Sequence, residues 1–412
     1  MKVLHINYSD SAGGAAVAAN RIHSSLLKSN ITSYLLVKEK LTSGKNIIGP
    51  KKNLDVIFSQ IKKNIFRKIN LFYSTNNFST HSLSLFPTNF HKTINNIDAD
   101  IVHLHWINNE MISIKEISKI KKPIVWTFHD MWPFCGAEHY SYNKRYIKGY
   151  QVFNRPLLEK GWDINRWVWL KKKKNWNFKF HVVCPSKWMF SAVKKSYLFK
   201  NKEIHLIPHP ISLKIWRPIN KNQAKKIIGI NKDKITLLYS STVYGNDTRK
   251  GSDIIDKIFS SEFFDKNKFQ FIILGSTTNL EKIIEKFNCK IFKPSFNDYL
   301  SLRLLYSASD LLLSPSKLEA FGQVIIEAGA CCTPAVAFNN TGSADLIKHK
   351  KTGYLAKYDN IDDFERGVRF CLSTFKRRTR MSEASKVFIN NEFSEKKIAN
   401  MYLNLYEKIL RK

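Results

Sequence analysis

The sequence predicts an α/β protein of two doubly wound, Rossmann-like domains, each with a mostly parallel sheet. Three observations lead to this prediction. The 412 residues exceed what one hydrophobic core usually organises, which favours two domains of about 200 residues each. Short apolar strands alternate with helices in both halves of the chain. A proline-punctuated stretch without apolar periodicity, residues 207–223, separates the halves, so we predict domains over 1–208 and 209–390.

In the first half, a short apolar strand leads through a Gly-rich turn, "SAGGAAVAA", into a helix with apolar residues at helical spacing. The turn lacks the GxGxxG pattern of dinucleotide-binding folds. Residues 38–95 show no clear pattern and are predicted only as a mixture of helix and loop. The strands of this half are expected over residues 2–7, 33–37, 101–106, 123–130, 181–186 and 203–210.

The second half repeats the alternation. Its strands are expected over residues 235–241, 269–276, 290–294, 310–316, 334–338 and 353–356. Its helices are expected over 251–259, 297–307, 322–331 and 343–348, followed by a last helix over Glu395–Leu410. Ligands of such sheets bind beyond the carboxyl ends of the strands. A site in a cleft between two such domains would therefore be built from strand-end loops of both.

Composition and cysteine spacing narrow the protein class. No secretory signal is visible, and the apolar runs are shorter than the ~20 residues that cross a bilayer, so we expect a cytoplasmic protein. The six cysteines show no CxxC pair and no zinc-type spacing. We therefore expect reduced thiols and no metal site.

The net charge of +34 indicates either an anionic partner or a compositional bias towards Lys, Asn and Ile. No nucleic-acid-binding module is present, so we predict no nucleic-acid partner. The segment 166–181, "RWVWLKKKKNWNFKFH", places Trp167, Trp169 and Trp176 beside Lys171–Lys174. This mixture suits peripheral contact with an anionic membrane, where indoles and lysines meet headgroups. A solvated helical face and nucleic-acid contact remain alternatives for this segment.

The stretch "EAFGQVIIEA" carries the sharpest chemical signal. Glu319 follows a buried strand, and a helix is expected to begin near Phe321–Gly322. The unpaired backbone N–H groups at such a helix end favour a phosphate. Glu327 follows one and a half turns later, within an apolar run. The two carboxylates could bind the hydroxyls of a nucleotide-sugar. Alternatively, Glu319 could interact favourably with the helix dipole while Glu327 lies on a solvated flank. Spacing alone does not separate these alternatives.

The segment Asp310–Leu355 resembles the donor-binding signature of retaining GT-B glycosyltransferases of glycosyltransferase family 4. Glu319 and Glu327 match the family's E-x7-E motif, and the later motifs match at Gly342–Ile347 and Thr352–Leu355. One departure is Cys332, where relatives usually carry glycine. "HDMWPF", from His129 to Phe134, resembles a block of bacterial members associated with exopolysaccharide and O-antigen assembly, although the cysteines usual downstream are missing.

This resemblance implies roles for individual residues. Glu319 would contact the donor sugar, Glu327 the ribose, and Phe321 and Gly322 the sugar and phosphate. His129 would touch the donor sugar, with Asp130 beside it in the donor site. Two cations before a helix could neutralise a leaving diphosphate, and the resemblance assigns this role to Arg249 and Lys250. It also makes Gly13 and Gly14 sites of close approach to the donor phosphates and the acceptor.

The resemblance further implies a GT-B enzyme that moves a sugar from a nucleoside-diphosphate-sugar to an acceptor hydroxyl with retention. No metal ion or cofactor is expected, since no Asp-x-Asp motif is placed at a strand end. The expected acceptor is a lipid-linked oligosaccharide in O-antigen, capsule or exopolysaccharide synthesis. The last segment, 391–412, would return to the first domain. Two alternatives remain: a nucleotide-sugar epimerase of the same fold, and a non-catalytic basic protein that binds anionic polymers.

Overall fold

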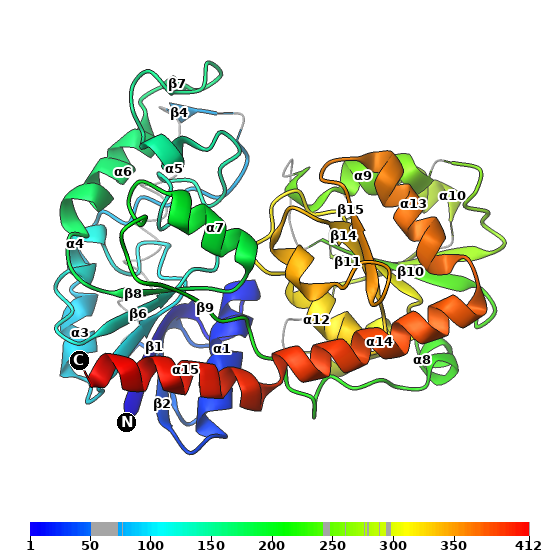
Figure 1. The fold of residues 1–412 in the computed structure, drawn as a ribbon, viewed down its shortest axis with the longest axis horizontal. Coiled ribbons are helices and arrows are strands. Elements are labelled where there is room, and N and C mark those ends of the chain that lie inside the picture. The colour runs from blue at the N-terminus through cyan, green and yellow to red at the C-terminus, as the bar shows by residue number, and fades with distance from the viewer. Residues whose placement is uncertain are drawn as a thin grey trace. The chain divides into compact units, whose positions relative to one another are not determined.

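The computed structural model describes residues 1–50, 73–75, 77–241, 248–259, 261–275, 277, 280–287, 289–293 and 298–411 (Figure 1). The chain divides into two compact units. The first contains Met1–Pro208 together with Ile398–Lys412, and the second contains His209–Lys397. Each is an α/β unit built around one parallel sheet, as the alternation of strands and helices predicts.

The first unit has a seven-stranded sheet in the order β3-β2-β1-β5-β6-β8-β9, whose neighbouring strands pair in parallel. The strands are β1 (Lys2–Ser9), β2 (Thr32–Glu39), β3 (Ile47–Ile48), β5 (Ile101–Leu104), β6 (Ile124–Thr127), β8 (His181–Cys184) and β9 (Ile204–Leu206). The helices are α1 (Gly14–Leu27), α3 (Phe90–Asn96), α4 (Ile114–Ile117), α5 (Arg145–Lys148), α6 (Ile164–Asn175), α7 (Lys187–Lys195) and α15 (Glu395–Leu410). A small antiparallel pair joins β4 (Tyr73–Ser74) to β7 (Lys160–Gly161).

The two faces of this sheet are covered differently. On one face lie α1 and α15 (Figure 1). Their apolar side chains pack against alternate residues of the strands, and Tyr402 and Tyr406 of α15 are fully buried. On the other face, Trp126 of β6 packs against Trp132 and Trp176. Because side chains alternate along a strand, the strands between these two layers read as continuous apolar runs.

The second unit has a six-stranded parallel sheet in the order β12-β11-β10-β13-β14-β15. The strands are β10 (Ile235–Ser241), β11 (Phe269–Gly275), β12 (Cys289–Phe292), β13 (Leu311–Ser314), β14 (Ala335–Phe338) and β15 (Gly353–Ala356). The helices are α8 (Lys221–Ile227), η2 (Thr248–Lys250), α9 (Ser252–Phe259), α10 (Glu281–Lys286), α11 (Tyr299–Ala308), α12 (Gln323–Ala330), η3 (Gly342–Leu346), α13 (Ile361–Leu372) and α14 (Phe375–Phe393).

Both faces of this second sheet are buried in hydrophobic clusters. Leu237, Leu311 and Val336 point to the face covered by α9 and α13. Leu238 and Leu312 point to the face covered by α8, α11 and α12. The strand order reverses between β10 and β13, which are neighbours in the sheet. The loops that follow these two strands therefore meet at the carboxyl edge of the sheet, where ligands of doubly wound folds bind.

The predicted fold class is confirmed, and most predicted elements are found within a few residues of their expected bounds. Two predictions were wrong in detail. The expected helix over 343–348 is the 3₁₀ helix η3, and the expected strand over 203–210 is limited to β9 because Pro208 and Pro210 have no N–H for the ladder. Residues 51–72 and 76, part of the unclear segment, lie outside the described residues. Among the helices described, none is long and apolar enough to cross a membrane.

Candidate functional site

The loops after β10 and β13 bring together three of the residues that the sequence predicts for the site. Lys250 ends η2, just after β10, and Glu319 lies in the loop after β13. The Lys250 Nζ lies 2.5 Å from the Glu319 Oε2. Arg249 stands beside them, and its Nη1 donates to the carbonyl oxygen of Leu318 at 3.1 Å. Two cations and a carboxylate therefore share one edge of the sheet.

Two glycines allow the backbones of these loops to approach closely. Gly251 has φ +73°, and a Cβ there would lie 2.3 Å from the carbonyl oxygen of Pro315, so only glycine fits. The Lys317 N–H donates to the Arg249 carbonyl at 2.8 Å across the same contact. On the other side, the Gly342 N–H donates to the Glu319 carbonyl at 2.7 Å, and a Cβ at Gly342 would lie 2.2 Å from the Ala320 oxygen.

The groups around Glu319 stabilise its negative charge. Burial raises the pKa of the Glu319 carboxyl, but the charges of Lys250 and Arg249, with hydrogen bonds from Lys250 and from the Phe321 backbone, bring the pKa below its ordinary value. Glu319 is therefore an ionised acceptor at neutral pH. A carboxylate in this state can accept charge-assisted hydrogen bonds from sugar hydroxyls.

The N-terminus of α12 adjoins the carboxylate. Gly322 is its N-cap residue, with φ +108°, and α12 begins at Gln323. The Phe321 side chain is only 2% exposed and packs against His209 and Phe393. That ring therefore belongs to the core beneath the loop, and the contact of Phe321 with the donor stays a prediction. The backbone N–H groups at the start of α12 are what this end offers to an anion.

Glu327 lies inside the domain and not on a solvated flank. It is 6% exposed, and its Oε2 accepts a hydrogen bond from the Tyr306 hydroxyl of α11 at 2.8 Å. Tyr306 was not predicted for the site. Its position in the sequence gave no signal, because the contact depends on the packing of α11 against α12.

In the first unit, His129 and Asp130 follow β6 but differ in what they contact. His129 is half-buried, and its Nε2 lies 3.0 Å from the Nδ1 of His105. Asp130 is 7% exposed, and its carboxylate accepts hydrogen bonds from Trp106 Nε1, from His139 and from the Trp132 N–H. The Asp130 side chain thus anchors the loop from within. The predicted place of Asp130 in the donor site stays a prediction.

Gly13 and Gly14 lie at the start of α1. Gly13 is the N-cap residue, with φ +91°, and a Cβ at either glycine would meet no atom within 4 Å. Packing inside the chain therefore does not require glycine at position 14. This open space is what a close-approach glycine needs, and the ligand contact itself stays a prediction.

The Trp-rich basic segment is more buried than the sequence suggests. Trp169 and Trp176 are 1% and 5% exposed, and the Lys172 side chain is fully buried, where its Nζ donates to the backbone carbonyls of Trp132, Cys135 and Gly136. The prediction that these two indoles meet a membrane is therefore wrong. Exposed apolar side chains lie instead in the loop before α6: Val152, Phe153, Leu157, Leu158 and Trp162.

Sequence reasoning also missed a group of histidines. His5 of β1 is the register partner of His103 of β5, and His105 follows two residues later on the same side. Ring nitrogens of these three residues lie within 4.8 Å of one another, and so do ligand atoms of His181, Glu203 and His205. The nitrogens of His103 are already engaged by hydroxyls of Tyr406 and Thr127, and His181 pairs with Glu203 at 2.9 Å. The pattern "HLH" could have indicated that two imidazoles share a face.

Two protein-family models match this chain. Residues 44–214 match the family model "Glycosyltransferase Family 4", and residues 220–388 match "Glycosyl transferases group 1". An uncharacterized 41.2 kDa protein in the cps region of Klebsiella pneumoniae is 24% identical over 99% of both chains. The N-acetyl-alpha-D-glucosaminyl L-malate synthase of Bacillus anthracis is 22% identical over 51% of this chain and 55% of its own length.

Solved structures share the fold. HepE of Anabaena, solved in complex with UDP-glucose, superposes with a TM-score of 0.62 at 13% identity, over 99% of this chain and all of HepE. This likeness confirms the predicted GT-B architecture of two Rossmann-like domains. The two family models lie one on each domain and together account for most of the chain.

Proposed function

We propose, from the premise that this chain is a glycosyltransferase of group 1 and family 4, that it transfers a sugar from a nucleoside-diphosphate-sugar to an acceptor hydroxyl with retention of configuration and without a metal ion. The observation that carries this proposal is the Lys250–Glu319 pair beside Arg249 and the start of α12. Cations and backbone N–H groups suit a diphosphate, and the carboxylate suits sugar hydroxyls.

The chemistry follows from these groups. The bond between the anomeric carbon and the phosphate oxygen breaks, and the negative charge that develops on the diphosphate is stabilised by Lys250, Arg249 and the N–H groups of α12. The acceptor oxygen bonds to the same face of the anomeric carbon. Its proton passes to the departing phosphate oxygen, so no side-chain nucleophile is needed.

A thermal-shift panel of UDP-, GDP-, ADP- and dTDP-sugars tests the donor site. HepE binds UDP-glucose, which makes the UDP-sugars the first to examine. We expect one nucleotide to stabilise the wild-type protein and to lose this effect in Glu327→Gln, which keeps the side-chain shape. Glu365→Gln serves as a control, because Glu365 pairs with Arg369 elsewhere on the same domain. Stabilisation by none of these nucleotides would contradict the proposal.

We further propose that the acceptor is lipid-linked and belongs to surface-polysaccharide synthesis. The relative from a cps region supports this substrate class. The exposed loop before α6 supports membrane contact, since Phe153 is 82% and Leu157 97% exposed. The loop is held by Arg145, whose guanidinium bonds Asp163 at 2.7 Å and the Gln151 carbonyl at 3.0 Å. Exposed lysines on the same segment, Lys144, Lys148 and Lys160, suit anionic headgroups.

Sedimentation with anionic liposomes tests the membrane contact. We expect the double variant Phe153→Ser/Leu157→Ser to bind less than the wild type. Phe375→Ser is the control, because Phe375 is 76% exposed on the other domain. Neutralising Lys171, Lys173 and Lys174, which are exposed on α6, examines the separate contribution of that helix. If all these variants sediment with the liposomes as the wild type does, this surface does not make the membrane contact.

The two alternative functions predict different results. An epimerase would isomerise the donor sugar without any acceptor. A binding protein for anionic polymers would bind with a steep dependence on salt and would be indifferent to Glu319→Gln. Incubation of the purified protein with donor alone, and polymer binding at two salt concentrations, separate these alternatives from a transferase.

A further inference from the structure

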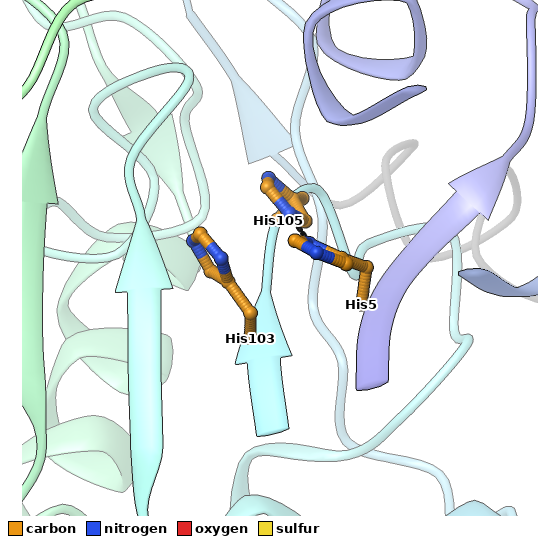
Figure 2. A group of neighbouring side chains, drawn as sticks. All are labelled: His5, His103 and His105. Carbon is orange, nitrogen blue, oxygen red and sulfur yellow. Dashed lines mark hydrogen bonds between the residues drawn. The ribbon is translucent and has the colours of Figure 1, made fainter. Parts of the chain in front are cut away.

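Three histidines form a hydrogen-bonded chain across three neighbouring strands: His5 lies in β1, His105 directly follows β5 and His129 follows β6. The Nδ1 of His5 lies 2.9 Å from the Nε2 of His105, and the Nδ1 of His105 lies 3.0 Å from the Nε2 of His129. Figure 2 shows the first of these contacts, with the rings of His5 and His105 turned towards each other and His103 beside them. His5 is fully buried, His105 is 2% exposed, and His129 is half-buried. The chain thus runs from the interior of the sheet to its carboxyl edge.

The chain has a direction because each ring is neutral. Burial lowers the pKa of His5 well below its ordinary value and that of His129 to about 4. A charged imidazolium between them, at the buried His105, would be costly. A neutral imidazole has one N–H and one bare nitrogen. His105 must therefore donate to one neighbour and accept from the other, so that both hydrogen bonds point the same way.

The inner end of the chain decides which way. The Nε2 of His5 is buried and has no hydrogen-bond partner among the residues that the structure describes. If the bonds ran inwards, this nitrogen would carry a buried, unpaired N–H, which is rarer in proteins than an unpaired acceptor. If they run outwards, His5 donates to His105, His105 donates to His129, and the hydrogen of His129 resides on its Nδ1.

We propose that His5 and His105 are positioning residues that hold His129 as the Nδ1–H tautomer, so that the Nδ1 of His129 is a hydrogen-bond donor and not an acceptor. The rings are well fixed for this purpose. The His105 backbone N–H donates to Ile6 O at 2.9 Å, and its carbonyl accepts from Trp126 Nε1 at 3.0 Å. His103 stacks on His105 at 4.2 Å and is itself held by Tyr406 at 2.6 Å.

This assignment restricts what His129 does. An Nδ1 that already carries hydrogen cannot take a proton from an acceptor hydroxyl, so His129 is not the general base, and a ligand atom that it contacts through Nδ1 is a hydrogen-bond acceptor. The identity of that ligand as a donor sugar rests on the proposed function. The tautomer itself does not, because it follows from the hydrogen-bonded chain inside the free protein.

Two variants at position 105 test the chain. His105→Asn keeps an amide N–H near the position of Nδ1 and can still donate to His129, whereas His105→Leu cannot. We expect kcat to fall about tenfold in His105→Leu, the loss of one hydrogen bond, and to be largely retained in His105→Asn. Stabilisation by nucleoside diphosphate should be unchanged in both. His91→Leu is the control, since His91 is buried against Glu116 away from this chain, and we expect it to lose thermal stability without a change in kcat.

Nitrogen NMR of the free protein with ¹⁵N-labelled histidine reads the tautomer directly, with His129→Gln to assign the signals. We expect a protonated Nδ1 at His129 in the wild type and in His105→Asn, and a loss of this preference in His105→Leu. A wild-type His129 protonated at Nε2 would overturn the proposal. Equal loss of kcat and of thermal stability in both variants at position 105 would also overturn it, because His105 would then be merely structural. Absence of any transferase activity would refute the proposed function while leaving the NMR result as the test of the chain.

Discussion

Lys250 and Glu319, 69 residues apart in the sequence, form an ion pair of 2.5 Å between Nζ and Oε2 at the carboxyl edge of the second sheet. Each follows one of the two strands between which the strand order reverses. The pair therefore lies where a doubly wound sheet offers its ligand site. A diphosphate bound there would share the Lys250 ammonium with Glu319. Hydrogen bonds from the sugar hydroxyls to the Glu319 carboxylate would then replace part of its interaction with Lys250.

The first prediction concerns Lys250. Lys250→Gln removes the cation that pairs with Glu319, and in the proposed mechanism it also removes the stabilisation of charge on the leaving diphosphate. We expect kcat/KM for sugar transfer to fall by about 10²–10³-fold. Lys386→Gln is the matched control, because Lys386 pairs with Glu383 on the surface of the same domain. Similar kinetics in the two variants would show that Lys250 is an ordinary surface lysine.

The second prediction concerns Gly14. In Gly14→Ala the added methyl group meets no atom of the chain within 4 Å, and alanine favours a helix start over glycine. We expect thermal stability to be unchanged or raised by up to about 1 kcal/mol. If a ligand approaches this backbone, KM for donor or acceptor rises in the same variant. Steady-state kinetics with an unchanged KM would remove Gly14 from the site.

The third prediction concerns Asp130. Burial raises its pKa, but His139 and the hydrogen bonds from Trp132 and Trp106 bring the pKa below its ordinary value. Asp130→Asn places an amide hydrogen against these donors. We therefore expect a loss of about 1–3 kcal/mol in the free energy of unfolding, measured by denaturant titration. Asp98→Asn is the control, because Asp98 pairs with Lys2 on the surface. A stable Asp130→Asn protein with impaired donor binding would instead support a direct donor contact.

The fourth prediction concerns Lys172. Burial lowers the pKa of Lys172 from its ordinary 10.5 to about 7. Between these two pH values the unfolded chain binds a proton that the folded chain does not, so this lysine makes stability rise with pH, by up to about 1.4 kcal/mol for each pH unit. Lys172→Met should remove that rise. The measurement is the free energy of unfolding from pH 7 to 10, with Lys173→Met as the neighbouring exposed control. Equal slopes in the wild type and both variants would contradict the prediction.

Local patterns in the sequence were enough to predict the two sheets and to propose the part of the candidate site that lies on one short segment. Glu319 and Glu327 lie eight residues apart, so the strand, the loop and the helix that carry them are already visible in the sequence. Glycines at 251 and 342 are fixed by backbone contacts that the sequence does not show, but their positions beside the motifs indicate turns.

By itself the sequence determined the alternation of strands and helices, because apolar periodicity is a property of neighbouring residues. Only the tertiary structure decided which side chains turn inwards: Phe321 and Asp130 face the interior of their domains, and Lys172 is buried among carbonyls. It also decided that His5, His105 and His129 form one chain, because the parallel register of β1, β5 and β6 places residues about 100 and 24 positions apart side by side. Hydrogen-bond partners across strands depend on that register, which no local pattern specifies.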